Sequence, residues 1–114
     1  ENITSIDKEF INNVITYINE NIEDENLNVE SLANKLFLSR SKLYRKIKAL
    51  TGDTANEFIK KIRLEKAKNL IENTDYSISE ISFKVGFSSP SYFTKCFKDY
   101  FEILPTEIRD QVIS

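Results

Sequence analysis

Two short stretches of this chain place a cation at the same point of a similar apolar pattern. Arg45 follows Leu43 by two positions, and Lys95 follows Phe93 by two positions. Both stretches begin with small serine side chains, which let a backbone approach a binding partner closely. Arginine and lysine donate hydrogen bonds to the O6 and N7 atoms of guanine, and arginine can donate two at once. These residues therefore predict the reading of base edges in a DNA groove.

The apolar spacing indicates which side chains are free for such contacts. Leu43, Ile47 and Leu50 recur at intervals of four and three, so they share the inner face of a helix, and Phe93 and Phe97 do the same in the second stretch. A solvated surface helix explains either stretch alone, and the repetition is what favours a binding function. The outer faces carry Arg40, Ser41, Tyr44, Arg45 and Lys48 in the first stretch, and Pro90, Ser91, Tyr92, Thr94, Lys95 and Lys98 in the second.

The two stretches belong to a longer duplication. In each copy a short apolar-periodic segment meets a break that contains serine, and a second helical segment follows. This order is typical of a helix-turn-helix unit, and two such units on one small domain indicate the reading of two neighbouring stretches of major groove. The first copy is Leu32-Ala33, Leu36, Leu38-Ser39, Leu43, Arg45, Ile47-Lys48 and Leu50, and the second is Ile81-Ser82, Val85, Phe87-Ser88, Phe93, Lys95, Phe97-Lys98 and Tyr100.

The elements that position these residues are expected to be helices throughout. Two glycines and two prolines in 114 residues leave few breaks, and no segment alternates convincingly with the period of a strand. One all-helical domain follows. The predicted helices span about residues 7–21, 29–37, 40–50, 55–73, 78–85 and 90–101, with a last turn or two from Pro105.

Capping residues mark where these helices begin and end. A polar side chain before a helix can accept a hydrogen bond from a free amide, and a Glu at the third helical position can return one. Gly52 stands where a left-handed residue would end the helix of the first copy. The expected N-caps are Asn28, Ser39, Thr54 with Glu57, Ser77 with Glu80, and Ser89 followed by Pro90.

The helix at 55–73 joins the two copies and carries five cations. Nineteen residues make a rod about 28 Å long, and one turn of B-DNA is about 34 Å. A rod of this length could hold two reading helices in successive major grooves, and its cations could then bind phosphate. Solubilising the helix is the simpler role for any one of them. The cations are Lys60, Lys61, Arg63, Lys66 and Lys68.

The composition limits which classes of function are possible. The net charge is −2, but residues 1–30 hold eight carboxylates against one lysine, which leaves 15 bases and 10 acids in the rest of the chain. With one cysteine and no histidine, the usual zinc-ligand sets and histidine-based catalysis are excluded, so neither a metal, a cofactor nor an enzyme is expected. No apolar run suits a membrane span or a secretory signal, so a cytoplasmic chain without membrane contact is expected.

Four segments closely resemble the DNA-binding domain of the AraC/XylS transcription regulators. They are Ser39–Gly52, Phe58–Ala67, Ile81–Phe87 and Ser89–Lys98. The resemblance covers about residues 27–110 and implies a bipartite domain of seven helices that activates transcription. It implies helix-turn-helix units at 27–52 and 77–101, a linking helix at 54–73 and a C-terminal helix at 105–114, after an acidic helix and linker at 1–26.

The resemblance also implies which residues touch DNA. By position, the base-reading residues are Ser41, Tyr44 and Arg45 in the first unit, and Ser91, Tyr92, Thr94 and Lys95 in the second. The neighbouring cations are the candidates for phosphate contact: Arg40, Lys42, Lys48, Lys60, Lys61, Arg63 and Lys98. The implied partners are double-stranded DNA, RNA polymerase subunits, and upstream receiver or sensor domains of the same chain.

The acidic first helix and the Leu-Tyr-Arg-Lys sequence at 43–46 are similar to the C-terminal output domain of hybrid two-component sensor and response regulators. The chain departs from the family at Phe37 and Glu102, where glycine is usual, and at Leu104, where serine is usual. At Phe37 a more tightly packed or altered turn is expected. The alternative function is a helical protein-interaction module whose basic face docks an acidic partner, which would need no groove-sized spacing between the copies.

Overall fold

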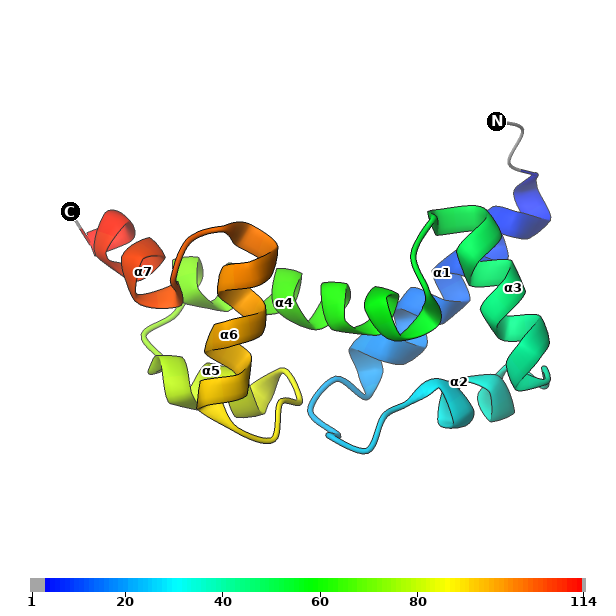
Figure 1. Cartoon of the computed structure of the whole chain (residues 1–114), viewed down its shortest axis with the longest axis horizontal. Coiled ribbons are helices and arrows are strands. Elements are labelled where there is room, and N and C mark those ends of the chain that lie inside the picture. The colour runs from blue at the N-terminus through cyan, green and yellow to red at the C-terminus, as the bar shows by residue number, and fades with distance from the viewer. Residues whose placement is uncertain (1–3, 114) are drawn as a thin grey trace. The chain divides into compact units, whose positions relative to one another are not determined.

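The computed structural model describes residues 4–113, and over this range it contains seven α-helices and no β-strand. The all-helical prediction is confirmed, as Figure 1 shows. No described helix is long and apolar enough to cross a membrane. The helices are α1 (Ser5–Glu20), α2 (Val29–Lys35), α3 (Arg40–Thr51), α4 (Ala55–Asn73), α5 (Ile78–Lys84), α6 (Pro90–Phe101) and α7 (Pro105–Ile113).

The helices form two compact units, which share α4. Unit 1 comprises residues 1–21 and 27–62, and unit 2 comprises residues 22–26 and 63–114. In unit 1, α1 packs against α2 and α3, and its Val14 and Ile18 are fully buried in the core. The helix of the acidic segment is thus part of the first unit. The other core residues of unit 1 are Leu27, Val29, Leu32, Ala33, Leu43, Ile47, Ala55, Phe58 and Ile59.

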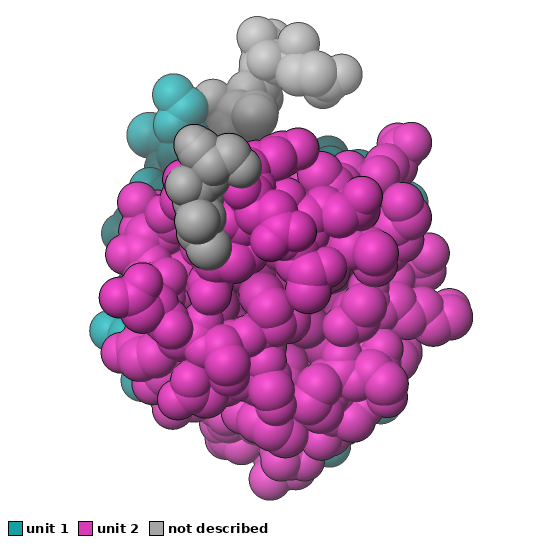
Figure 2. Space-filling model, turned by 90° about the vertical axis from the view of Figure 1, so that its left-hand side faces the viewer, with its two compact units in different colours: residues 1–21, 27–62 teal, residues 22–26, 63–114 magenta. Residues whose placement is uncertain are grey.

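Unit 2, drawn in magenta in Figure 2, has a core built from aromatic rings. Phe93 and Phe97 of α6 are fully buried, with their ring centroids 5.6 Å apart. Phe87 packs edge-on against Phe93 at 5.2 Å, and Phe101 lies 4.6 Å from Phe97. Such tilted contacts stabilise an aromatic cluster beyond the area that it buries. α6 is thereby anchored by one face and leaves the other to solvent.

The predicted caps are confirmed. The hydroxyls of Ser39 and Ser89 each accept from the amide three residues on, at 3.2 Å, at the starts of α3 and α6. Thr54 and Glu57 form both bonds of a capping box at 3.1 and 2.9 Å, and Asn28 and Ser77 also cap as expected. Thr4 was not predicted as a cap, and its capping box with Asp7 starts α1 two residues earlier than expected.

The duplication extends beyond the two helix-turn-helix units. The turn between α2 and α3 is closed by a hydrogen bond from the Leu38 amide to the Ala33 carbonyl, and the turn between α5 and α6 by the equivalent bond from Phe87 to Ser82, both at 2.9 Å. The start of α7 then repeats the start of α4, because Glu107 accepts from the Leu104 amide at 2.8 Å. Leu104 has no side-chain oxygen, so only half of that capping box is kept.

The two positions where this chain departs from the usual glycine both carry a positive φ. Phe37 has φ 58° and Glu102 has φ 62°, a left-handed conformation that is strained for a residue with a Cβ. The expectation of a more tightly packed first turn is wrong, because the Phe37 side chain is 95% exposed. The backbone of this turn points the ring into solvent. Glu102 ends α6 as Gly52, with φ 82°, ends α3.

Candidate nucleic-acid interface

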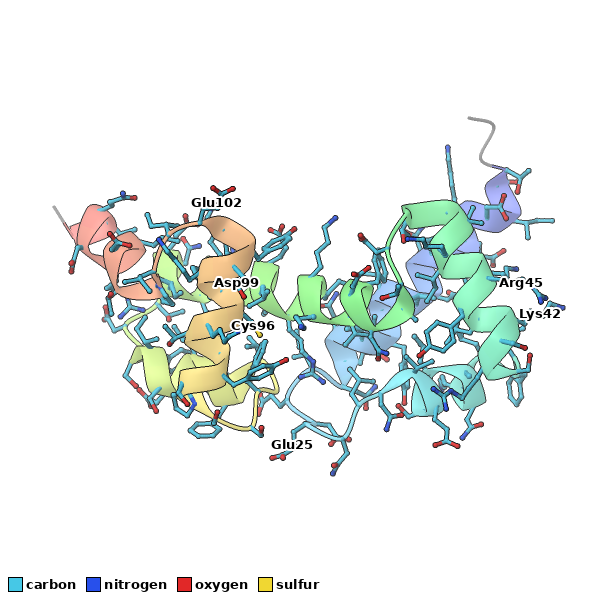
Figure 3. The ribbon with its side chains drawn as sticks, viewed as in Figure 1. Glu25, Lys42, Arg45, Cys96, Asp99 and Glu102 are labelled. Atoms are coloured by element: carbon cyan, nitrogen blue, oxygen red, sulfur yellow. The ribbon has the colours of Figure 1, made fainter. Side chains whose placement is uncertain are left out.

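α3 presents a basic outer face in unit 1. Its start is capped by Ser39, and Leu43 and Ile47 bury the opposite face completely. Figure 3 shows Lys42 and Arg45 projecting outward from this helix. Most of the predicted contact residues of α3 are exposed to solvent, namely Arg40, Ser41, Lys42, Arg45 and Lys48. These side chains lie along one helix, and the major groove of B-DNA is wide enough to admit an α-helix.

Tyr44 lies differently from the other predicted base-reading residues of α3. It is half-buried against the core of unit 1, and its hydroxyl accepts a hydrogen bond from Asn56 Nδ2 of α4 at 3.2 Å. Arg40 donates a longer bond to the same hydroxyl at 3.5 Å and lies 5.7 Å from the ring centroid. That hydrogen bond is the main cause that raises the pKa of Arg40. The Tyr44 side chain is therefore held between two polar partners.

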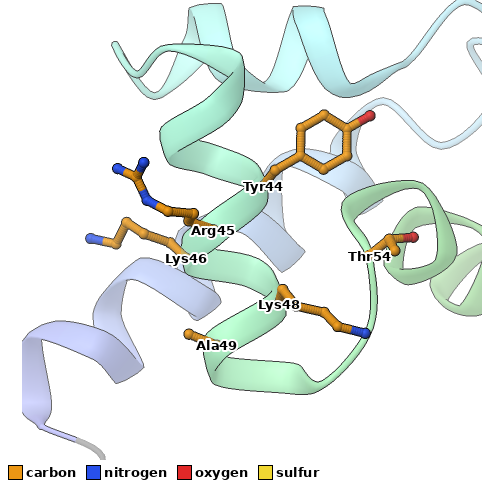
Figure 4. Close-up of a pocket in the computed structure, with 6 residues that line it drawn as sticks. All are labelled: Tyr44, Arg45, Lys46, Lys48, Ala49 and Thr54. Atoms are coloured by element: carbon orange, nitrogen blue, oxygen red, sulfur yellow. The ribbon is translucent and has the colours of Figure 1, made fainter.

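An open depression lies beside α3 and is lined by Tyr44, Arg45, Lys46, Lys48, Ala49 and Thr54. In Figure 4, Arg45 and Lys46 project from one side of the helix, and Tyr44 and Lys48 project from the other, toward the segment that carries Thr54. Lys48 Nζ donates to the Gly52 carbonyl at 2.7 Å and so caps the end of its own helix. Lys46 lies over the Phe10 ring at 4.5 Å. Arg45 is exposed to solvent.

α6 presents the corresponding outer face in unit 2. Ser91, Tyr92, Lys95 and Lys98 are exposed, and Thr94 is half-buried. Lys95 is not equivalent to Arg45 in its surroundings, because its Nζ lies 3.7 Å from the Asp99 carboxylate, with both side chains at least 70% exposed. Position 49, the counterpart of 99 in the first copy, is alanine. Lys98 donates to the Glu102 carbonyl at 3.3 Å, which repeats the cap made by Lys48.

The cations of α4 divide into exposed and buried residues. Lys60 and Lys61 are exposed, and Lys61 lies 3.6 Å from the Asp53 carboxylate. The prediction that Arg63 contacts phosphate is wrong, because its side chain is only 6% exposed. Its guanidinium donates to three carbonyl oxygens of unit 2: Ile22 at 2.7 Å, Val85 at 2.6 Å and Asp24 at 3.1 Å.

Arg63 ties the segment 22–26 to the second helix-turn-helix unit. Burial lowers the pKa of its guanidinium, but a charge with several hydrogen bonds to carbonyl groups stays ionised at neutral pH. The guanidinium lies directly against Gly86, and a Cβ added there would overlap both the Arg63 side chain and the Ile22 carbonyl. The glycine of the second turn is therefore required for space as well as for its φ of 91°. Arg63 holds the turn that leads into α6.

Two features of the site were not predicted from the sequence. Asn56 carried no signal, because an asparagine in the first turn of a helix is common on a surface. Its position above Tyr44 depends on how α3 and α4 pack. Arg63 lies on the same helix as four lysines and was therefore grouped with them as a surface cation. Its identity as arginine was the available signal, since buried cations with several acceptors are usually arginine.

A capped, basic helix that follows a short helix and a tight turn, present once in each unit, defines the helix-turn-helix class of DNA-binding domains. The family described as a helix-turn-helix domain matches this chain over residues 32–111. The chain belongs to this family, in its AraC type, and is a DNA-binding domain of transcription regulators.

Three comparisons illustrate the family. The chain is 39% identical over 109 residues to histidine kinase P4 of Formosa agariphila, a match that covers 96% of the chain but only 8% of that protein. The C-terminal domain of the response regulator AraT from Geobacillus stearothermophilus superposes with a TM-score of 0.82 at 30% identity, covering 97% of this chain and 88% of that domain. The DNA-binding domain of AdpA in complex with a target DNA gives 0.80 at 27% identity, covering 87% and 88%.

Proposed function

We propose that the chain is the output domain of a bacterial two-component regulator and that α3 and α6 read two adjacent segments of the DNA major groove. The observation that carries this proposal is the duplication: each unit has a serine-capped helix with a cation at the same position, Arg45 or Lys95. The similarity to a DNA complex and to a response-regulator domain supports it. α4 is one uninterrupted helix of 19 residues between the two proposed reading helices.

Within this proposal the predicted contact residues have two kinds of role. Arg45 and Lys95 donate to guanine, with Arg45 the better bidentate donor. The smaller base contacts are made by Ser41, Tyr44, Ser91, Tyr92 and Thr94. Arg40, Lys42, Lys48, Lys60, Lys61 and Lys98 bind phosphate, which contributes affinity without sequence preference.

The rest of the regulator supplies control. The chain covers a small part of the length of the histidine kinase that it resembles, so receiver and sensor domains upstream in the same protein are part of the proposal. Phosphorylation of a receiver would then set DNA binding, and contact with RNA polymerase subunits would activate transcription. This function places the protein in the bacterial cytoplasm.

Selection from a random duplex library, followed by footprinting on the selected duplex, tests the proposed function. We expect protection of two major-groove segments about one helical turn apart. Affinity should fall steeply with salt, because phosphate binding releases counterions. Selection of no sequence, with no duplex binding even at low salt, would instead favour the protein-interaction module.

A further inference from the structure

Asn56 joins two elements of the first unit through a single side chain. It lies in the first turn of α4, and its Nδ2 donates to the Tyr44 hydroxyl of α3 at 3.2 Å. Asn56 is itself exposed, so this bond is formed at the surface of unit 1. The hydroxyl also accepts from Arg40 at 3.5 Å. One oxygen thus links the start of α4 to the first turn of the reading helix.

The hydrogen-bonding capacity of the Tyr44 hydroxyl determines which further partner it can bind. A tyrosine hydroxyl has one proton and two lone pairs. With Asn56 and Arg40 as its two donors, both lone pairs are used and the proton is left to donate to an acceptor. Phosphate oxygens and the acceptor atoms of bases are such acceptors.

The same arrangement orders Arg40. An arginine side chain on a helix surface has many rotamers, and fixing one before binding lowers the entropy lost on binding. Here the guanidinium lies 5.7 Å from the Tyr44 ring centroid while it donates to the hydroxyl. Because Asn56 holds the ring from the α4 side, it also limits where Arg40 can go.

We propose that Asn56 is a positioning residue for DNA reading by α3. It acts on the Tyr44 hydroxyl, which it leaves free to donate its proton outward. Through Tyr44 it also limits the position of Arg40. This inference rests on the proposed function and adds to it a residue that makes no DNA contact of its own.

At the equivalent positions of the second unit, which the structure describes, this arrangement is not repeated. The residues 50 positions after Arg40, Tyr44 and Asn56 are Pro90, Thr94 and Thr106. Proline has no donor, and threonine is too short to repeat the bridge. The effect of Asn56 is therefore confined to the half of the site that α3 reads.

A double-mutant cycle on the 114-residue chain tests the inference. Asn56→Ala, Tyr44→Phe and the double variant are titrated against a duplex selected by the wild-type chain, and against duplexes with single base changes in each half. Arg45→Ala identifies the half that α3 reads. Thr106→Ala is the matched control in the second copy, and circular dichroism checks that each variant keeps its helices.

We expect each single variant to bind about three- to tenfold more weakly, the loss that follows from one hydrogen bond. Base preference should relax in the α3 half alone, and the double variant should be no weaker than Tyr44→Phe. Losses that multiply in the double variant, unchanged binding by Asn56→Ala, or equal weakening on every duplex would each overturn the inference while leaving the proposed function intact. Failure of the wild-type chain to bind any duplex would overturn both.

Discussion

The two helix-turn-helix units place glycine at opposite ends of the reading helix. Unit 1 has Phe37 in the turn before α3 and Gly52 after it, whereas unit 2 has Gly86 before α6 and Glu102 after it. All four residues have a positive φ. Both copies are therefore left-handed at these two points, and the neighbours of each position decide whether a side chain is tolerated there.

Neighbours explain three of the four positions. Beside Gly86 the Arg63 guanidinium and the Ile22 carbonyl fill the space of a Cβ, so no side chain fits. The Phe37 ring points into solvent, so this turn bears the strain without a clash. A Cβ on Gly52 would meet nothing within 4 Å, so glycine serves there only for its φ. One fold thus uses glycine for space in one unit and for conformation in the other.

The largest effect should come from Gly86→Ala. The new methyl group would displace a buried, hydrogen-bonded guanidinium, and leaving such a charge without its partners costs about 3–5 kcal/mol. Gly52→Ala, at a similar φ in open space, should cost about 1–2 kcal/mol. Urea unfolding of the two variants measures the difference. Equal losses would mean that Arg63 does not fill the second turn.

The reverse substitutions should stabilise the protein. Phe37→Gly and Glu102→Gly remove the strain of a left-handed residue with a Cβ, against the larger entropy that glycine gives the unfolded chain, and each should raise the free energy of unfolding by up to about 1 kcal/mol. Thermal unfolding midpoints would show it. A lower midpoint for Phe37→Gly would indicate that the exposed ring makes a stabilising contact.

The sequence predicted the helices and their caps better than the tertiary contacts between them. Helices and caps follow from local chemistry, so Ser39, Ser89 and the Thr54–Glu57 box could be assigned without a structure. Arg63 could not, because its acceptors Ile22 and Asp24 are 41 and 39 positions away. Tighter packing at Phe37 was expected because a phenylalanine stands where glycine is usual, and only the turn geometry shows that its side chain faces out.

The reading helices differ in one acid, and removing it should strengthen the second unit. Asp99→Ala would give α6 the alanine that α3 has at position 49, and it frees Lys95. Exposed ion pairs contribute about 0.2–1 kcal/mol, so DNA affinity should rise by up to about fivefold. Fluorescence anisotropy titration checks this. Asp53→Ala, which frees Lys61 outside the reading helices, is the control and should not sharpen base preference.

Acid should loosen a capping box in each unit, with the smallest effect. Hydrogen bonds from Thr54 lower the pKa of Glu57, and those from Ser77 lower the pKa of Glu80. Because the pKa of each carboxyl is lower in the folded protein than its ordinary value of 4.5, each capping box stabilises the protein fully above that pH. This stabilisation is lost as the pH falls through the lower, folded-state pKa. In the Glu57→Gln and Glu80→Gln variants, the free energy of unfolding should depend less on pH below pH 4.5. An unchanged pH dependence would contradict this assignment.

Arg45 and Lys95 are proposed to read bases in different halves of one site. The most direct measurement is the affinity of Arg45→Ala and Lys95→Ala for duplexes with every single base change across the selected site. We predict that each variant loses about 1–3 kcal/mol on the selected sequence and becomes indifferent to base identity in one half only, a different half for each. Uniform weakening of both variants on all duplexes would contradict the account, because it would make both residues phosphate contacts.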